Sequence, residues 1–255
     1  PFRIPHMADG YTYASAVNEA LSNDRLSPRY TMHDMRLIAG HMHPQLFPDI
    51  DWQALILRKV AFTHDVNLTF DGKGQRIRYF VYANYNSNRG FLNNTEMNDG
   101  YSTQIGMDAL KVRSNIEARL TKSTVARINL MGRLMQYQHP SAGTNLSGMY
   151  DTPAAAFYPL APQSEGGGWV RSRLCKNPLA DLTSRGYNTV LQRTLFADLT
   201  IDQNLEMITP GLSAQVRVAY DNSAEITDMR TCDFAYMEVS SANDEIGNVK
   251  ELLYT

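Results

Sequence analysis

Apolar and polar side chains alternate with a period of two along residues 191–221. From Leu195 the odd positions are apolar, with one exception, as far as Leu205, and the even positions between them are mostly polar or charged. A turn at 209–211 interrupts the pattern, which restarts at Leu212. Because successive side chains of a strand point to opposite faces, the pattern predicts an antiparallel hairpin with one apolar and one charged face.

The same pattern predicts two more hairpins. Residues 62–85 alternate on both sides of a tight turn at 71–75, and residues 115–134 alternate on both sides of a turn at 122–123. The first turn contains the sequence DGKG, whose residues suit the positive φ of a short hairpin loop. The C-terminal tail alternates less regularly, and a turn is predicted there at 243–248.

Long connections separate the hairpins. They occupy the residues before 60, residues 86–110 and residues 138–188. In an antiparallel meander this order places every tight turn at one end of the sheet and every long connection at the other. Outer-membrane barrels have this layout, with short periplasmic turns and long external loops. Sandwiches instead place long loops at both ends.

The first 58 residues lack the period-two pattern. Residues 11–23 have a helical composition, and Thr31 can cap a second short helix through a capping box with Asp34. Residues 49–59 predict one further helical turn. The chain therefore divides at residues 1–58 and 59–255 into a region with short helices and a region of strands.

Two fold classes remain open for the strands. In a soluble sandwich, Ile128, Leu199 and Val216 would meet one another across two stacked sheets. In a barrel wall they would lie on one face, turned towards hydrocarbon, and the charged face would line a watery lumen. Charged residues in mid-strand favour the lumen, although the outer face of a sandwich would also hydrate them.

Composition excludes several classes of function. The chain has 255 residues, of which 43% are hydrophobic and 20% charged, and its formal net charge of −2 gives no electrostatic basis for binding nucleic acid. No apolar run reaches the roughly 18–20 residues of a membrane-spanning helix. The chain begins at Pro1 without a signal peptide, so we expect a piece of a longer protein. Cys175 and Cys232 could form one disulfide, but free thiols are the favoured interpretation.

Short motifs along the chain resemble the early barrel of the SusC/RagA-like TonB-dependent transporters, in that family's order and spacing. The motifs lie at residues 18–24, 51–52, 61–69, 77–81, 113–116, 177–180, 211–213 and 220–222. The resemblance implies an all-β fold: an antiparallel transmembrane β-barrel segment of six or seven strands. The whole barrel in that family has about 22 strands and a plugged lumen. Residues 1–58 would then be an external loop region, and residues 59–255 would hold barrel strands and long external loops.

The resemblance also implies a function and a location. The family imports glycans, oligosaccharides or peptides across the cell outer membrane, with a SusD-like lipoprotein as a lid. Energy comes from the TonB–ExbB–ExbD complex, which acts through a plug domain that we do not find in this sequence. The further expected partners are the remainder of the chain's own barrel and the lipid bilayer.

Two groups of residues are candidates for function. The first should face the lumen, where it could also hold the plug by ion pairs: Arg78, Arg119, Arg127, Asp198 and Asp202. The second could face substrate from the longest connection: Trp169, Arg171, Arg173, Tyr150 and Tyr158. The aromatic members could offer stacking faces to sugar rings, or they could simply pack the loop against a lid or the barrel mouth.

No catalytic arrangement emerges from the sequence. His33, His41 and His43 lie close together but match no strong metal-ligand spacing. Asp198 and Asp202, on one strand face, would lie roughly 13 Å apart, whereas glycoside hydrolysis needs carboxyl groups about 5–9.5 Å apart. We therefore expect no enzyme and no cofactor. The rival to the importer is a secreted or surface all-β module for carbohydrate binding or adhesion.

Overall fold

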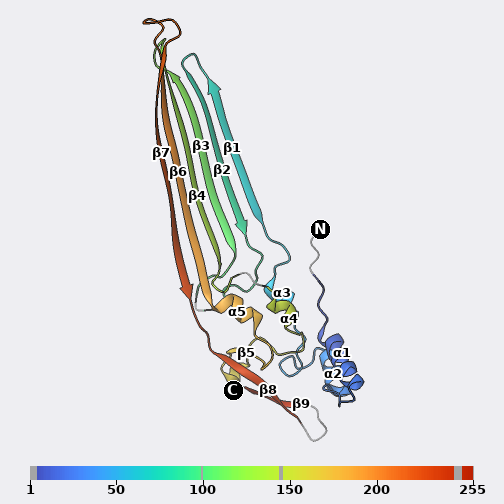
Figure 1. The fold of residues 1–255 in the computed structure, drawn as a ribbon. Coiled ribbons are helices and arrows are strands. Elements are labelled where there is room, and N and C mark those ends of the chain that lie inside the picture. The colour runs from blue at the N-terminus through green and yellow to red at the C-terminus, as the bar shows by residue number, and fades with distance from the viewer. Residues whose placement is uncertain (1–4, 99, 144–145, 244–248, 255) are drawn as a thin grey trace.

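The computed structural model describes residues 5–98, 100–143, 146–243 and 249–254, and a large antiparallel sheet dominates it (Figure 1). Six strands lie in the order β1-β2-β3-β4-β6-β7. Their bounds are β1 Thr63–Lys73, β2 Ile77–Arg89, β3 Gly106–Arg119, β4 Thr124–Pro140, β6 Gly186–Asn204 and β7 Ser213–Thr231. The three predicted hairpins are confirmed, and they join side by side into one meander.

The connections of the large sheet alternate in length as predicted. The tight turns after β1, β3 and β6 lie together at one end, and the long connections after β2 and β4 lie at the other (Figure 1). The strands extend further into the long connections than the sequence pattern indicates. β7 continues to Thr231, for example, because Thr231 still pairs with Gly186 of β6. An existing neighbour strand therefore extends the pairing beyond the regular alternation.

The register across the large sheet brings apolar residues into common rows. Ile128 pairs with Ile116 on one side and with Leu199 on the other, and Leu199 pairs with Val218. Ile128, Leu199 and Val216 have exposed fractions of 38%, 39% and 62%. These residues lie side by side in one sheet, and no second sheet covers them in the described part of the chain. The sandwich arrangement is therefore not present among the described residues.

The N-terminal helices form where capping residues begin them. They are α1 Gly10–Asn23, α2 Met32–Ala39 and α3 Trp52–Ile56. Asp9 accepts a hydrogen bond from the Thr12 backbone N–H at 2.7 Å, and Thr31 and Asp34 form the predicted capping box. The helices predicted in this region are thus confirmed. None of the helices in the described ranges has the length and apolar character needed to cross a membrane.

A second folded region lies at the long-connection end of the large sheet, and we call it the cap. Its elements are α3, α4 Gly148–Asp151, the 3-10 turn η1 Gln163–Glu165, α5 Pro178–Ser184 and a small sheet. The strands of that sheet are β5 Trp169–Arg171, β8 Tyr236–Asn243 and β9 Val249–Tyr254, in the order β5-β8-β9. Most of the turn predicted at 243–248 lies outside the described residues.

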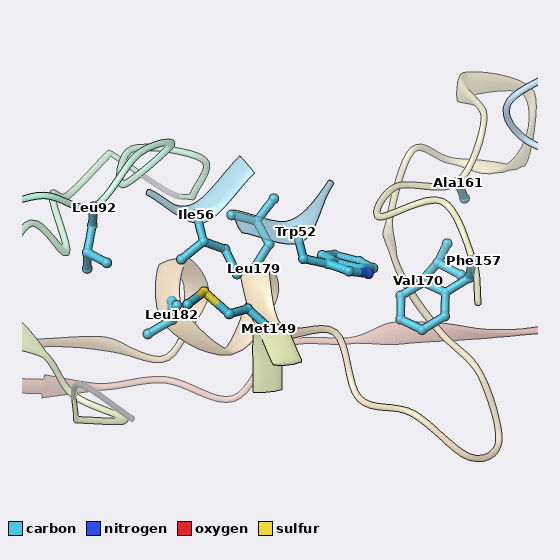
Figure 2. Close-up of a cluster of buried hydrophobic side chains, with 9 residues drawn as sticks. All are labelled: Trp52, Ile56, Leu92, Met149, Phe157, Ala161, Val170, Leu179 and Leu182. Atoms are coloured by element: carbon cyan, nitrogen blue, oxygen red, sulfur yellow. The ribbon is translucent and has the colours of Figure 1, made fainter. Parts of the chain in front are cut away.

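The cap encloses a hydrophobic core that the sequence pattern did not predict (Figure 2). The core gathers side chains from segments far apart in the chain: Trp52, Ile56, Leu92, Met149, Phe157, Ala161, Val170, Leu179 and Leu182. The Trp52 and Phe157 rings meet edge to face, with centroids 5.5 Å apart. The connection at 138–188, expected to be irregular, is therefore a packed structure. The tail at β8 and β9 belongs to the cap sheet and does not continue the large sheet.

Candidate functional site

One face of the large sheet collects most of the charged residues of its strands. The register places Arg78 and Arg127 in one row, Arg119 and Asp202 in the next, and Asp198 in a third row on the same side. The five residues expected to face a lumen therefore share one face of the sheet, which we call the polar face. Their grouping follows from the period of two. Counted along any one strand, the three rows lie two residues apart, so their side chains point to the same face.

Ion pairs and hydrogen bonds link the polar face across the strands. Arg127 contacts Asp202 through Nη1, and its Nε lies 3.4 Å from Glu117 Oε2. Gln215 donates to Asp202 at 2.6 Å. Asp198 accepts a hydrogen bond from Asn129 at 3.0 Å. The network thus ties β3, β4, β6 and β7 together.

Two members of the predicted lumen group remain outside this network. Arg78 and Arg119 lie on the polar face, and neither forms an ion pair within the described part of the chain. Arg217 of β7, which the sequence analysis did not single out, instead pairs with Asp198 at 3.7 Å. The polar face therefore holds both internally satisfied charges and arginines available to a further group.

A second polar cluster, on β1 and β2, was missed by the sequence analysis. The Asp65 carboxylate accepts hydrogen bonds from the amides of Asn67, Asn84 and Asn86, and the Asn84 bond measures 2.7 Å. Tyr82 donates to Asn67 at 2.6 Å. The available signal was the alternation of Asp65 and Asn67 on β1 with Asn84 and Asn86 on β2, but side chains at facing positions can be paired only once the register is known.

The opposite face of the large sheet is apolar over a defined height. On β4 the apolar rows run from Ala126 to Leu134, a distance of roughly 27 Å at about 3.4 Å per residue, and on β6 the Leu134 row holds the charged, exposed Arg193. In the next row Gln136 aligns with Asp108, Ser87 and His64, so the band ends there on β1 to β4. Exposed members include Val66, Leu68, Phe70, Val216, Val218 and Tyr220.

The residues expected to face substrate do not gather into one site. Trp169 and Tyr150 pack against the hydrophobic core of the cap. Arg171 lies over the Tyr236 ring at 3.5 Å and 3.7 Å from Glu238. The packing alternative accounts for Trp169 and Tyr150, and Arg171 ties β5 to β8.

Arg173 and Tyr158 differ from the other three residues. Tyr158 is half-buried in the cap, whereas Arg173 is exposed. Arg173 lines a cavity of about 510 Å³ together with Arg29, a residue that the sequence analysis did not select. Segments more than a hundred residues apart form this cavity, so no local pattern could have predicted it.

The described residues offer no cluster of three or more His, Cys, Asp or Glu side chains that could hold a metal ion. His41 lies instead 3.3 Å from Asp49. Cys175 and Cys232 are both free thiols.

Comparison with known proteins shows the fold. No protein-family model matches the chain, and no curated protein sequence matches it. The structure is similar to the RagAB peptide importer in the 'closed-closed' state, with a TM-score of 0.58 and 14% identity over 89% of this chain and 26% of that chain. It is also similar to a structure of the RagAB peptide transporter, with a TM-score of 0.54 and 14% identity over 87% of this chain and 26% of that chain.

A third similar structure is the RagAB peptide importer in the 'open-open' state, with a TM-score of 0.50 and 14% identity over 74% of this chain and 21% of that chain. The chain thus spans about a quarter of the length of the first two structures that it matches. At this identity the likeness shows the fold alone. The fold is mostly β, with a six-stranded antiparallel sheet and few helices, as in a section of those chains.

Proposed function

We propose that the chain is a section of an outer-membrane nutrient importer of the SusC/RagA-like, TonB-dependent class. The large sheet is a section of its transmembrane β-barrel wall, with the apolar band towards lipid and the polar face towards the lumen. One observation carries the proposal: apolar side chains form an uncovered band in register across one sheet, opposite a hydrogen-bonded polar face. The band's height of roughly 27 Å suits the apolar belt of such barrels, which is about 25 Å.

The edges of the large sheet support the same proposal. Within the described sheet, β1 and β7 each pair on one side only. Because unpaired backbone groups are costly in hydrocarbon, a lipid-facing sheet has to continue until it closes. Further strands of the same barrel are the partners that would satisfy these edges. The short-turn end then faces the periplasm and the cap lies outside the cell.

The cargo and the protein partners are part of the proposal. The similar structures are described as a peptide importer and a peptide transporter, which favours peptides over glycans or oligosaccharides as cargo. A SusD-like lipoprotein acts as the lid at the external end, and the TonB–ExbB–ExbD complex supplies energy through a plug domain. The chain itself performs no catalysis. Arg78 and Arg119, on the polar face, are the residues best placed to bind the plug.

A pair of neighbouring substitutions on β7 tests the membrane assignment. Val218 lies on the apolar face and Ala219 on the polar face, opposite Asp198, and both are exposed. In a barrel wall, Val218→Arg should lower the stability of the assembled protein by about 2–4 kcal/mol and deplete it from the outer-membrane fraction. Ala219→Arg should leave the amount of assembled protein unchanged.

The rival adhesion or carbohydrate-binding module predicts a different result. In a soluble module the apolar face would be covered by another protein layer or open to water, so neither variant would change the amount of protein in the outer-membrane fraction. The protein would also remain in solution without detergent. Cell fractionation of the natural protein and both variants, followed by quantitative immunoblotting, measures the difference. Equal recovery of both variants from the soluble fraction would rule out the importer.

A further inference from the structure

The cavity beside the cap combines positive charge with an apolar wall. It lies between the α1–α2 helical region and the segments of the cap on either side of β5. Two arginines line it, Arg29 from the first region and Arg173 from the second. None of the lining residues, all of which belong to the described ranges, carries a carboxylate.

Both arginines are available to a ligand. Neither forms an ion pair with a carboxylate in the described part of the chain, and Arg29 makes only a distant contact with the Tyr30 ring, at 5.7 Å. Arg171, two residues before Arg173, is by contrast held by Tyr236 and Glu238. Two unpaired arginines on one cavity favour an anion, and guanidinium groups suit the geometry of a carboxylate.

Polar groups beside the arginines add further hydrogen-bonding capacity. The Tyr30 hydroxyl is protonated at neutral pH, and burial raises its pKa further, so it can donate a hydrogen bond. The side-chain oxygen of Gln45, another lining residue, is buried without a hydrogen-bond partner among the described residues. A ligand whose amide N–H donates to this buried oxygen would bind more tightly, because the hydrogen bond removes the cost of an unsatisfied buried acceptor.

Most of the remaining wall is apolar. Leu46 and Pro48 contribute from the helical side, and Phe157 and Leu174 contribute from the cap. The volume of about 510 Å³ falls in the usual range of small-ligand sites, which is about 300–1,000 Å³. A ligand that fits this wall therefore has an apolar body next to its negative charge.

We propose that this cavity binds the carboxylate end of a small amphipathic ligand between Arg29 and Arg173. The proposal rests on the importer function above and refines it, because it places a cargo-binding subsite in the external region. A short peptide with a free C-terminus supplies this chemistry, and so does an acidic oligosaccharide. The common element is a carboxylate attached to a body that contacts Leu46 and Phe157.

Cys175 provides a reporter inside the same cavity. It is a half-buried free thiol that lines the cavity, whereas Cys232 lies elsewhere, 3.3 Å from Arg230 Nε, and serves as an internal reference. The natural protein, purified in detergent, is labelled with a maleimide with and without ligand. The probes are the tripeptide Ala-Ala-Leu with a free C-terminal carboxylate, the same tripeptide as its C-terminal amide, and a galacturonic acid trimer. Mass spectrometry gives the labelling rate of each thiol.

The expected results concern the ratio of the two labelling rates. The tripeptide acid should slow the labelling of Cys175 and leave Cys232 unchanged, and the amide should need about tenfold more ligand for the same protection. Arg29→Gln and Arg173→Gln should each weaken protection by about tenfold. Arg58→Gln, which removes an exposed arginine outside the cavity, should have no effect. Stronger protection by the galacturonic acid trimer would support the carboxylate site and identify acidic glycans as its ligand.

Two outcomes would overturn the proposal. One is equal protection by the tripeptide acid and its amide, and the other is absence of protection by all three probes. This assay is separate from the test of the importer, because it needs no insertion into a membrane. A protein in the outer membrane that fails the labelling test loses only the cavity proposal. A soluble protein that passes it keeps the carboxylate site and loses the importer proposal, together with the cargo role of that site.

Discussion

The large sheet and the cap are stabilised in different ways. Of the buried hydrophobic residues in the described part of the chain, only Ala109 and Val190 belong to the large sheet. The others lie in the cap or near α1 and α2. The cap therefore buries its own core, as a small soluble domain does. The sheet exposes its apolar side chains and relies on backbone pairing, so its apolar face needs surroundings that the described residues do not supply.

The largest expected effect is the loss of Trp52 from the cap core. Its side chain is 2% exposed, it meets Phe157 edge to face, and its indole N–H donates to the Pro153 carbonyl at 3.2 Å. Trp52→Ala should lower the free energy of unfolding of the cap by about 3–5 kcal/mol, because it leaves a cavity in the core and removes one of the two hydrogen bonds to the Pro153 carbonyl. When the Trp52→Ala substitution is made in the natural protein, limited proteolysis should cut the cap while the large sheet stays protected.

The matched control for Trp52 is Phe62, which lies just before β1 and is 65% exposed. Phe62→Ala should leave the cap as resistant to protease as it was. If Trp52→Ala released the large sheet and the cap together, the two regions would form one cooperative unit, and the contrast between them would be lost.

The next effect concerns Gly186, where α5 passes into β6 and the cap joins the sheet. Gly186 has φ +97°, and a Cβ there would meet the Arg230 carbonyl oxygen at 1.9 Å. Gly186→Ala should destabilise the junction by about 3 kcal/mol, since it adds backbone strain to a clash with backbone. Hydrogen exchange of β6 and β7 should speed up at the cap end first.

Gly132 in the middle of β4 is the control for Gly186. A Cβ at Gly132 meets nothing within 4 Å. Gly132→Ala should therefore change stability by less than about 1 kcal/mol, and the same hydrogen-exchange measurement tests it. Equal effects of the two alanine variants would contradict a special role for the junction.

The same contrast explains what could be predicted from the sequence. The hairpins of the large sheet were predictable because a strand with one apolar and one polar face has a sequence in which apolar and polar residues alternate. The grouping of Arg127 with Asp202 followed from that period, but their contact across β4 and β6 depends on the register. The cap core was not predictable, because Trp52 and Leu179 come from segments without a regular period. The cavity of Arg29 and Arg173 was missed for the same reason.

A smaller effect is expected at Asn177, which lies in the cap region and is the N-terminal capping residue of helix α5. Its side-chain oxygen accepts from the Ala180 N–H at 3.1 Å, and its amide donates to the carbonyls of Pro159 and Val170 at 2.9 and 2.8 Å. Asn177→Ala should cost about 2 kcal/mol, because the Ala180 N–H and the Val170 carbonyl lose these hydrogen bonds, whereas the Pro159 carbonyl keeps the one from the Val170 N–H. Asn177→Asp keeps the side-chain oxygen that accepts from the Ala180 N–H and removes the amide that donates to the Pro159 and Val170 carbonyls. An Asp variant as stable as the natural protein would show that the two carbonyls contribute nothing.

The smallest effect is expected on the polar face, at the pair of Arg127 and Asp202. Their side chains are 44% and 29% exposed, and Gln215 also bonds Asp202. Partly exposed ion pairs contribute about 0–1 kcal/mol, so a double-mutant cycle of Arg127→Met and Asp202→Asn should give a coupling energy below about 1 kcal/mol. A coupling energy above about 2 kcal/mol in the natural protein would mean that another segment covers this face, because burial strengthens a charge pair. Repeating the cycle at high salt separates the two cases, since salt screens an open pair far more than a covered one.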